Sequence, residues 1–454
     1  MTDLTKRVLS GELLTSKPLA IVPVMATAST DLPTSCADST APSPAAARRL
    51  IGVLGALTAV APLATDMYVP GFPELGRALH ASSSGVQLTM TAFLAGLVVG
   101  QLVIGPISDG LGRRRLLIGG ATGFAVLTVV CALAPNVAVL TTARFLQGVA
   151  GAGGMVLARA VLTDRFHGAE LPRYFAVLSQ VMGVAPVVAP VLGGAVLSVS
   201  TWRAVFAVLA AVGILLLLGV LRAVPESLSP ERRQRNGLGS TFRAMGSLLG
   251  RRAFMGYVLV LGFSSAALFS YIAGSSFVFE EIHGVSASTY SLIFAANSAG
   301  MLIAGAAFGR LALRVPLHTL LTIGVGLATA GALAQVVLRL TVGETLAGTW
   351  ITLFVSIGSI GLILPSTASI GQALARHAPG AASAVLGGLQ FLLGALASPL
   401  VGLFGTHSSL PMAVIMLISM TCACFALAGF ARPWQGNGEP KSSPPVTETE
   451  RLGR

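Results

Sequence analysis

The sequence carries very little charge. Asp, Glu, Lys and Arg make up only 10% of its 454 residues, whereas an ordinary soluble domain has about 25%. Hydrophobic residues make up 54% of the chain, and the mean hydropathy is +0.82. A water-soluble fold cannot bury so large a share of apolar side chains. The composition therefore excludes a soluble enzyme, a nucleic-acid-binding protein and a disordered hub, and it indicates an integral membrane protein.

Residues suited to metal binding or covalent catalysis are also scarce. Only four cysteines occur, and Cys131, Cys422 and Cys424 lie in apolar runs without the spacing of a metal site. All six histidines fall in loops or at the ends of apolar runs. The sequence has no phosphate-binding loop of the Walker type. We therefore expect no metal site, no bound cofactor, no enzyme activity and no direct use of ATP.

Apolar runs of about 20 residues repeat along the chain, and each is long enough to form one transmembrane helix. The sequence predicts twelve spans, near residues 49–70, 86–107, 115–134, 137–158, 174–198, 203–221, 254–277, 288–309, 317–338, 346–367, 381–404 and 409–430. This pattern predicts an all-α polytopic membrane protein with two six-helix halves.

The longest loop and the two polar ends divide the chain into five regions. We expect a disordered cytoplasmic N-terminal tail, an N-terminal six-helix bundle, a cytoplasmic linker, a C-terminal six-helix bundle and a cytoplasmic C-terminal tail. Their predicted ranges are 1–47, 48–221, 222–253, 254–431 and 432–454.

The basic residues fall almost entirely in loops on one side of the predicted spans. Only Arg77, Arg203 and Arg339 fall on the other side. Because cytoplasmic loops collect Lys and Arg, the long loop and both termini are expected in the cytoplasm. The net charge of +12 is explained by this asymmetry, so it does not indicate a nucleic-acid partner.

The two halves share a sequence pattern at corresponding positions. Gly105, Asp109, Gly112 and Arg113 end the second span and open the third, and a weaker version of the pattern follows the eighth span at 305–314. Two related halves around a central site are the architecture of an alternating-access transporter.

Four segments resemble motifs of the major facilitator superfamily. Residues 105–115 resemble its motif between the second and third helices, except at Gly110, where a basic residue is common. Residues 144–151 resemble the membrane-embedded arginine motif of proton-coupled drug antiporters, and 183–194 resemble the antiporter motif, except at Pro186. Residues 65–70 are similar to the first-helix signature of the bicyclomycin and chloramphenicol resistance branch.

A proton-coupling pair is expected at Asp66 and Arg144, which are the one carboxylate and the one basic residue well inside a predicted span. A carboxylate in hydrocarbon is costly unless it is protonated, paired or hydrated, so Asp66 is the natural proton carrier. We expect Arg144 to neutralise it across a central cavity. The alternatives are that Asp66 lies at the membrane interface and that Arg144 only hydrogen-bonds carbonyls of the first helix.

Three further groups of residues are candidates for function. The first is an antiporter motif that seals the fifth helix against the other half: Gly183, Pro186, Pro190, Gly193 and Gly194. The second is a conformational gate at the cytoplasmic end: Gly105, Asp109, Gly112 and Arg113, although the arginines beside Asp109 are equally explained as positive-inside anchors. The third consists of possible substrate contacts: Tyr68, Gln147, Gln180, Asn297, Gln390 and Phe391.

The resemblance implies proton-coupled efflux of a drug-like organic molecule, of the chloramphenicol type or a related antibiotic, across the bacterial cytoplasmic membrane. It implies that the proton motive force takes the place of a cofactor and that the partners are the drug, protons and the lipid bilayer. We expect the chain to act as a monomer. An alternative is a proton symporter of the same fold that imports a sugar or an organic acid.

Overall fold

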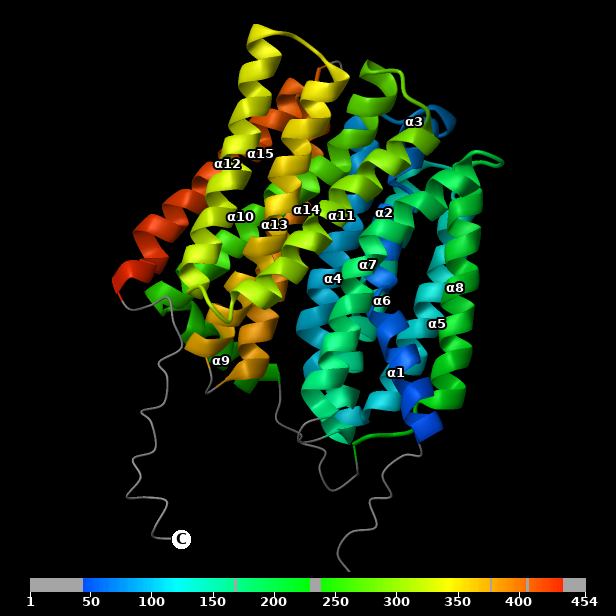
Figure 1. Cartoon of the computed structure of the whole chain (residues 1–454). Coiled ribbons are helices and arrows are strands. Elements are labelled where there is room, and N and C mark those ends of the chain that lie inside the picture. The colour runs from blue at the N-terminus through cyan, green and yellow to red at the C-terminus, as the bar shows by residue number, and fades with distance from the viewer. Residues whose placement is uncertain (1–43, 167–169, 229–237, 376–377, 406–407, 436–454) are drawn as a thin grey trace, which may run out of the picture. The chain divides into compact units, whose positions relative to one another are not determined.

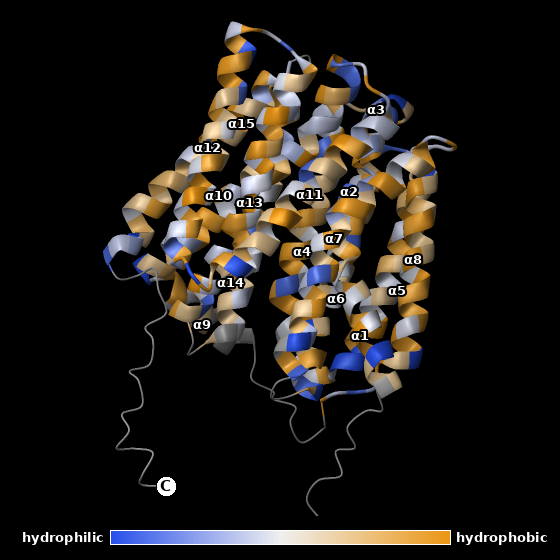
Figure 2. Cartoon of the chain, viewed as in Figure 1, coloured by the Kyte–Doolittle hydropathy of each residue, from blue (hydrophilic) through white to orange (hydrophobic). Residues whose placement is uncertain are grey.

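The computed structural model describes residues 44–166, 170–228, 238–375, 378–405 and 408–435. Within these residues, twelve helical segments are long and apolar enough to cross a membrane. The predicted number of spans and the all-α fold class are therefore confirmed. Figure 2 shows that hydrophobic residues cover most of each helix, while hydrophilic residues gather toward the helix ends.

The first span, Ala45–Ala78, is broken into short helices. It consists of α1 (Pro44–Thr58), α2 (Val60–Asp66), the 3-10 turn η1 (Val69–Gly71) and α3 (Phe72–Ala78). Three prolines in this region, Pro62, Pro70 and Pro73, lack the backbone N–H that a continuous helix requires. The breaks leave Asp66 at the end of α2, inside the span.

The remaining spans are longer helices. In the first half they are α4 (Ser83–Leu111), α5 (Arg113–Ala132), α6 (Val137–Arg165), α7 (Glu170–Leu197) and α8 (Trp202–Ala223). In the second half they are α10 (Arg252–Ser276), α11 (Ala287–Leu311), α12 (Leu317–Thr341), α13 (Leu346–Leu374), α14 (Pro379–Leu403) and α15 (Leu410–Ala426). Figure 1 shows α1–α8, coloured blue to green, as one group and α10–α15 as the other.

Short elements continue some spans. π-Helical turns extend α10 over η3 (Phe277–Ile282) and α15 over η4 (Leu427–Ala431), which the 3-10 turn η5 (Pro433–Gln435) follows. Inside the segment predicted as a linker lies one more helix, α9 (Leu238–Leu249). Its Leu248 packs in an apolar cluster with Phe254 and Leu386, and Met245 packs against the same cluster.

Caps and one tight turn set the ends of several helices. The side chains of Ser82, Asn136 and Ser286 each accept a hydrogen bond from a backbone N–H in the first turn that follows, as N-caps do. Gly112 joins α4 to α5 with φ at 96°, a conformation that strains any side chain with a Cβ atom. The backbone conformation therefore explains why a glycine occupies this position of the predicted gate motif.

Glycines allow helices within each half to approach closely. A Cβ atom on Gly96 would collide with the carbonyl oxygen of Phe145, and one on Gly148 with that of Phe93, so α4 and α6 touch backbone to backbone. In the other half, Gly361 of α13 meets the carbonyl oxygen of Met301 of α11 in the same way. Small residues at such contacts are how membrane helices pack.

The two halves meet along α4 with α14 and α7 with α11. Gln87 in the first turns of α4 connects them: its Nε2 donates to the Ala273 carbonyl at 3.1 Å, and its Oε1 accepts from the Gly402 N–H at 2.7 Å. Because Gln87 is fully buried, these bonds join the halves at the end of the bundle where α3 lies.

A second polar connection at this end joins α12 to α15. Glu344 accepts hydrogen bonds from the backbone N–H and the hydroxyl of Ser409 at 2.9 and 2.8 Å, and it pairs with Arg339 at 2.6 Å. Burial acts to raise the pKa of Glu344, but these donors together hold it below its usual value. The carboxylate therefore stabilises the loop between α12 and α13 in its charged form.

Candidate functional site

A cavity of about 610 Å³ lies between the two halves. Its lining comes from α2, α4, α6 and α7 on one side and from α10, α11, α13 and α14 on the other. Most of the lining is aliphatic, aromatic or methionine side chain. Among the described residues that form it, Asp66 is the only one with a charged group. A mostly apolar pocket with a few polar groups is the usual form of a small-molecule site.

Asp66 enters this cavity from the last turn of α2. Its side chain is only 3% exposed, and its Oδ1 accepts a hydrogen bond from the Thr65 hydroxyl at 2.9 Å. Thr65 in turn donates to the Ala61 carbonyl at 3.0 Å, so the carboxylate is held against its own helix. The structure therefore buries Asp66 within the first candidate span, at the cavity between the halves.

Arg144 contacts the short helix that carries Asp66 but lies outside the cavity lining. Its guanidinium lies over the rings of Tyr68 and Phe93, at 4.4 and 4.2 Å from their centroids, and it is completely buried. It donates to the carbonyl of Ala64 at 2.9 Å. Among the described residues, no ion pair joins Arg144 to Asp66. This placement agrees with the alternative that Arg144 hydrogen-bonds a carbonyl of the first span.

The hydrogen bonds of Gln147 explain why Arg144 lies there. Gln147 Oε1 accepts from Arg144 at 2.7 Å, and its Nε2 donates to the Thr128 hydroxyl of α5 at 2.6 Å. Aromatic faces and carbonyl oxygens can stabilise a buried guanidinium without a carboxylate. Arg144 and Gln147 therefore connect α2, α5 and α6 inside the first half.

The expected substrate contacts divide into two groups. Gln180, Gln390 and Phe391 line the cavity together with Asp66. The other three residues do not. Gln147 faces Arg144, the Tyr68 hydroxyl lies 3.2 Å from that of Thr89, and Asn297 is fully buried behind the lining. Their side chains are directed by partners on neighbouring helices, which a single sequence does not display.

The aromatic side of the cavity was only weakly indicated by the sequence. Phe269 and Tyr271 of α10 and Phe294 of α11 line it, and Phe269 packs against Phe391 with ring centroids 6.0 Å apart. The sequence alone presents them as aromatic residues in apolar helices, which face lipid or other helices more often than a cavity. Only the tertiary structure, which places them in one cavity lining with residues of α2, distinguishes them from other aromatic residues of the spans.

The helix α7 forms a close contact with both halves through adjacent glycines. A Cβ on Gly193 would collide with the Met67 carbonyl oxygen, and one on Gly194 with the Ser291 hydroxyl of α11. Pro186 and Pro190 lie inside the same helix, and Pro186 and Gly183 reach the cavity lining. The predicted sealing motif thus runs from the cavity to a tight contact with the broken first span.

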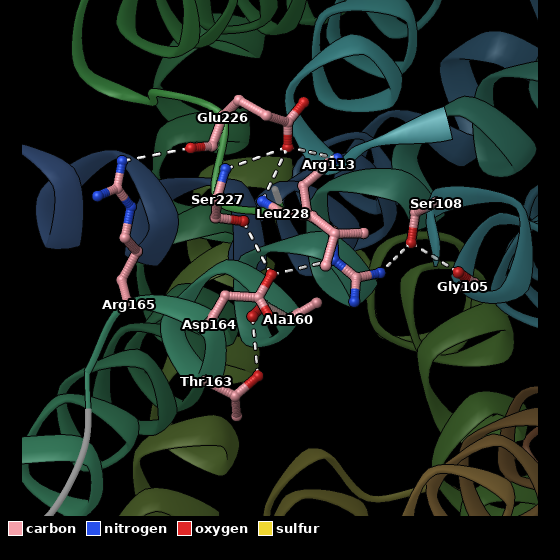
Figure 3. Close-up of polar contacts among 10 residues, drawn as sticks. All are labelled: Gly105, Ser108, Arg113, Ala160, Thr163, Asp164, Arg165, Glu226, Ser227 and Leu228. Atoms are coloured by element: carbon pink, nitrogen blue, oxygen red, sulfur yellow. Dashed lines mark hydrogen bonds and ion pairs between the residues drawn. The ribbon is translucent and has the colours of Figure 1, made fainter. Parts of the chain in front are cut away.

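A polar network joins the predicted gate residues to the start of the central loop, as Figure 3 shows. Arg113 pairs through Nε with Asp164 of α6 at 3.2 Å and donates through Nη1 to the Ser108 hydroxyl, which itself donates to the Gly105 carbonyl. Arg113 is therefore more than a positive anchor at the membrane surface, because it connects the ends of α4 and α6.

Glu226 completes this network from just beyond α8. Its Oε1 accepts from the backbone N–H groups of Arg113, Ser227 and Leu228 at 2.9, 3.1 and 3.2 Å. The Ser227 hydroxyl donates to Asp164 at 2.8 Å. A carboxylate at the first N–H groups of α5 stabilises that helix end. Neither acid was singled out in the sequence, where both appear as ordinary loop charges.

Several predictions cannot be followed fully in the structure. Most of the two predicted tails, residues 1–43 and 436–454, lies outside the described residues. The side chain of Asp109, predicted to form the gate, lies outside the described residues. Among the residues that are described, no group of three or more His, Cys, Asp or Glu could hold a metal ion.

Residues 54–399 match the sequence model of a family described as Major Facilitator Superfamily. The chain is 40% identical to an uncharacterised MFS-type transporter, YdgK, of Bacillus subtilis, with 84% of this chain and 94% of that protein covered. It is 29% identical to a bicyclomycin resistance protein homolog of Haemophilus influenzae, covering 80% and 91% of the two chains. It is also 29% identical to the multidrug transporter MdfA of Escherichia coli O6:H1, covering 73% and 80%.

Solved structures show the same fold at low sequence identity. A bacterial homolog of the lysosomal transporter Spinster aligns with a TM-score of 0.69 at 16% identity, covering 88% of this chain and all of the other. The Escherichia coli xylose transporter XylE aligns with a TM-score of 0.68 at 14% identity, covering 85% and 98%.

Proposed function

Because the chain belongs to the major facilitator superfamily, we propose that it exports a drug-like organic molecule, of the chloramphenicol type or a related antibiotic, in exchange for protons. The observation that carries this proposal is Asp66, the single carboxylate among the described lining residues of a mostly apolar cavity between the two halves. Relatives named as a bicyclomycin resistance homolog and a multidrug transporter support drug export over other cargo.

The position of Asp66 suits a residue that couples a proton to a drug. A carboxylate among apolar groups is costly while it is charged and unpaired, and protonation or a ligand relieves that cost. Asp66 lines the cavity that would hold the drug, so a proton and a drug would compete to stabilise it. Proton release toward the cytoplasm as the drug binds, and drug release outside as a proton returns, give an exchange cycle.

The proton motive force is sufficient for this cycle without a cofactor. One charge crossing a membrane potential of 100 mV supplies about 2.3 kcal/mol, and one pH unit adds about 1.4 kcal/mol per proton. Together these correspond to a gradient of about 500-fold of a neutral drug for each proton. We propose that the chain works as a monomer in the bacterial cytoplasmic membrane, with both termini in the cytoplasm.

Arg144 has a positioning role in this proposal. Its bond to the Ala64 carbonyl attaches the last turn of α2, two residues before Asp66, to α6. A change in the charge of Asp66 would therefore act on a helix turn that is hydrogen-bonded to α6.

The test is drug resistance in a sensitive bacterial host, comparing the chain with Asp66→Asn at matched membrane expression. The panel contains chloramphenicol, florfenicol, bicyclomycin and ethidium. We expect resistance to chloramphenicol or florfenicol that Asp66→Asn abolishes, because the amide cannot carry the proton. Glu281→Gln, which neutralises an exposed carboxylate outside the central cavity, is the matched control and is expected to keep resistance.

Two outcomes would contradict the proposal. Resistance retained by Asp66→Asn would exclude Asp66 as the sole proton carrier. If the protein reaches the membrane but gives no resistance, the symporter alternative is favoured, and uptake of sugars and organic acids into the same cells would distinguish the two directions of transport.

A further inference from the structure

Three side chains from three helices of the second half form a hydrogen-bonded chain that ends at the cavity. The indole Nε1–H of Trp350 on α13 donates to Asn297 Oδ1 on α11 at 3.1 Å. Asn297 Nδ2 donates to the hydroxyl oxygen of Tyr271 on α10 at 3.0 Å. Asn297 is fully buried, and of the three residues only Tyr271 lines the cavity.

The chemistry of these groups gives the chain one direction. An indole N–H can only donate, so the atom of Asn297 that faces Trp350 is its carbonyl oxygen. The NH₂ group of Asn297 must then face Tyr271, and it also can only donate. The Tyr271 oxygen is therefore the acceptor in this bond, and its own O–H proton is left to donate elsewhere.

No partner takes that proton within the described part of the chain, where the Asn297 bond is the one hydrogen bond of the Tyr271 hydroxyl. The Tyr271 ring is held by stacking on Phe294, with centroids 5.3 Å apart and planes at 27°. Tyr271 and Asp66 both line the cavity. The bond to Asn297 and the stacking on Phe294 thus fix Tyr271 in the same lining that contains the carboxylate.

We propose that Tyr271 binds substrate by donating a hydrogen bond to an acceptor oxygen of a neutral molecule, such as an amide carbonyl or a nitro group, with Asn297 and Trp350 as positioning residues. This inference rests on the proposed function and adds the class of substrate that the cavity selects. A lipophilic cation without an acceptor atom gains nothing from this hydroxyl.

The chemistry of the remaining lining supports this selection. None of the described lining residues is basic. Besides Tyr271, the lining side chains that can donate a hydrogen bond are Thr65, Ser179, Gln180, Ser298 and Gln390. Thr65 already donates to Asp66 and to carbonyls of its own helix. An acceptor-bearing ring compound placed beside Phe294 and Phe269 therefore finds in Tyr271 a donor next to its aromatic contacts.

The experiment compares two probes, chloramphenicol, which has an amide carbonyl and a nitro group, and tetraphenylphosphonium, which has no acceptor. Dissociation constants are measured on the purified full chain, and export is measured in cells. We expect Tyr271→Phe to weaken chloramphenicol binding about three- to tenfold, the value of one hydrogen bond, and to leave tetraphenylphosphonium binding unchanged. The matched control is Tyr290→Phe, because that hydroxyl lies 2.7 Å from the hydroxyl of Ser275 and does not line the cavity.

A double-mutant cycle tests the positioning role. Trp350→Phe keeps an aromatic ring but releases the Asn297 amide, so we expect a smaller loss of chloramphenicol binding than in Tyr271→Phe. If Trp350 acts through Tyr271, the double variant Tyr271→Phe/Trp350→Phe should bind as Tyr271→Phe alone does. If the two losses of chloramphenicol binding simply add, Trp350 only supports packing. That result would overturn its proposed role in positioning Tyr271.

The outcomes separate this inference from the proposed function. Equal losses for both probes, or unchanged chloramphenicol binding in Tyr271→Phe, would overturn the role of Tyr271 even if the chain exports drugs. If the chain exports neither probe and gives no resistance to any drug of the panel, the proposed function fails. In that case binding of the two probes to the purified protein still decides whether Tyr271 selects acceptor-bearing molecules.

Discussion

Arg144 shows how a single charged residue can be stabilised in the membrane interior without an ionic partner. Its guanidinium lies over two aromatic rings and is bonded to a carbonyl and an amide oxygen. Arginine suits this site because its planar group stacks and donates in fixed directions, whereas the ammonium group of lysine is a compact and strongly hydrated charge. The site therefore requires more than positive charge.

We expect Arg144→Lys to lose about 2 kcal/mol of stability, because the hydrogen bonds of a buried charged group are broken. Drug export should also fall, because the last turn of α2 loses the hydrogen bond from Arg144 to the Ala64 carbonyl. Thermal unfolding in detergent and resistance at matched expression measure the two effects. Arg159→Lys on the same helix is the control, because Arg159 is exposed. Wild-type stability and export in Arg144→Lys would show that charge alone suffices.

At the scale of the element, α7 combines two kinds of sequence signal in one helix. Its internal prolines remove backbone donors and allow a bend. Its adjacent glycines place the helix backbone directly against Met67 in one half and Ser291 in the other. Because both contacts leave no room for a methyl group, this end of α7 connects the broken first span to α11.

Gly193→Ala should therefore be costly. A Cβ would collide with the Met67 carbonyl oxygen, and overpacking of this kind costs about 1–3 kcal/mol. We expect a lower unfolding temperature and reduced export. Gly52→Ala in α1 is the matched control, because nothing lies within 4 Å of its added methyl group and alanine favours helix. Equal behaviour of the two variants would exclude a tight seal at Gly193.

At the scale of the whole molecule, charge is distributed unevenly between the ends of the spans. Among the described residues, the arginines that follow α4 and α11 lie on one side, while Arg77, Arg203 and Arg339 lie on the other. Carboxylates on the second side neutralise part of this small positive charge, as Glu344 does for Arg339. The positive-inside rule therefore favours a single orientation for the whole chain.

Fusions to reporter enzymes should show that orientation. Alkaline phosphatase fused after Gly343, between α12 and α13, should be active because it reaches the periplasm. The same enzyme fused at Arg454 should be inactive, and green fluorescent protein at Arg454 should be fluorescent. The reverse pattern would place both termini outside and would invert the direction of transport that we propose.

The sequence by itself determined the membrane class and the number of spans, and it singled out the buried carboxylate Asp66, whose proton-carrying role stays a proposal. These follow from local physics, because each apolar run must satisfy its own backbone hydrogen bonds in lipid and therefore forms a helix. A carboxylate such as Asp66 stands out in any apolar run because of its cost there. The breaks around it were not predicted, because the span was expected to be continuous over 49–70, although Pro62 and Pro70 lie in the broken region.

Only the tertiary structure decided which polar side chains reach the cavity. Helices that are apolar on every side show no periodicity that distinguishes the face toward a cavity from the face toward lipid. Asn297 turns away because Trp350 and Tyr271 bond it from other helices, and Arg144 turns toward Ala64 for a similar reason. The network of Glu226 with Arg113 joins residues 113 positions apart. Such pairings depend on how distant helices pack, which local sequence does not encode.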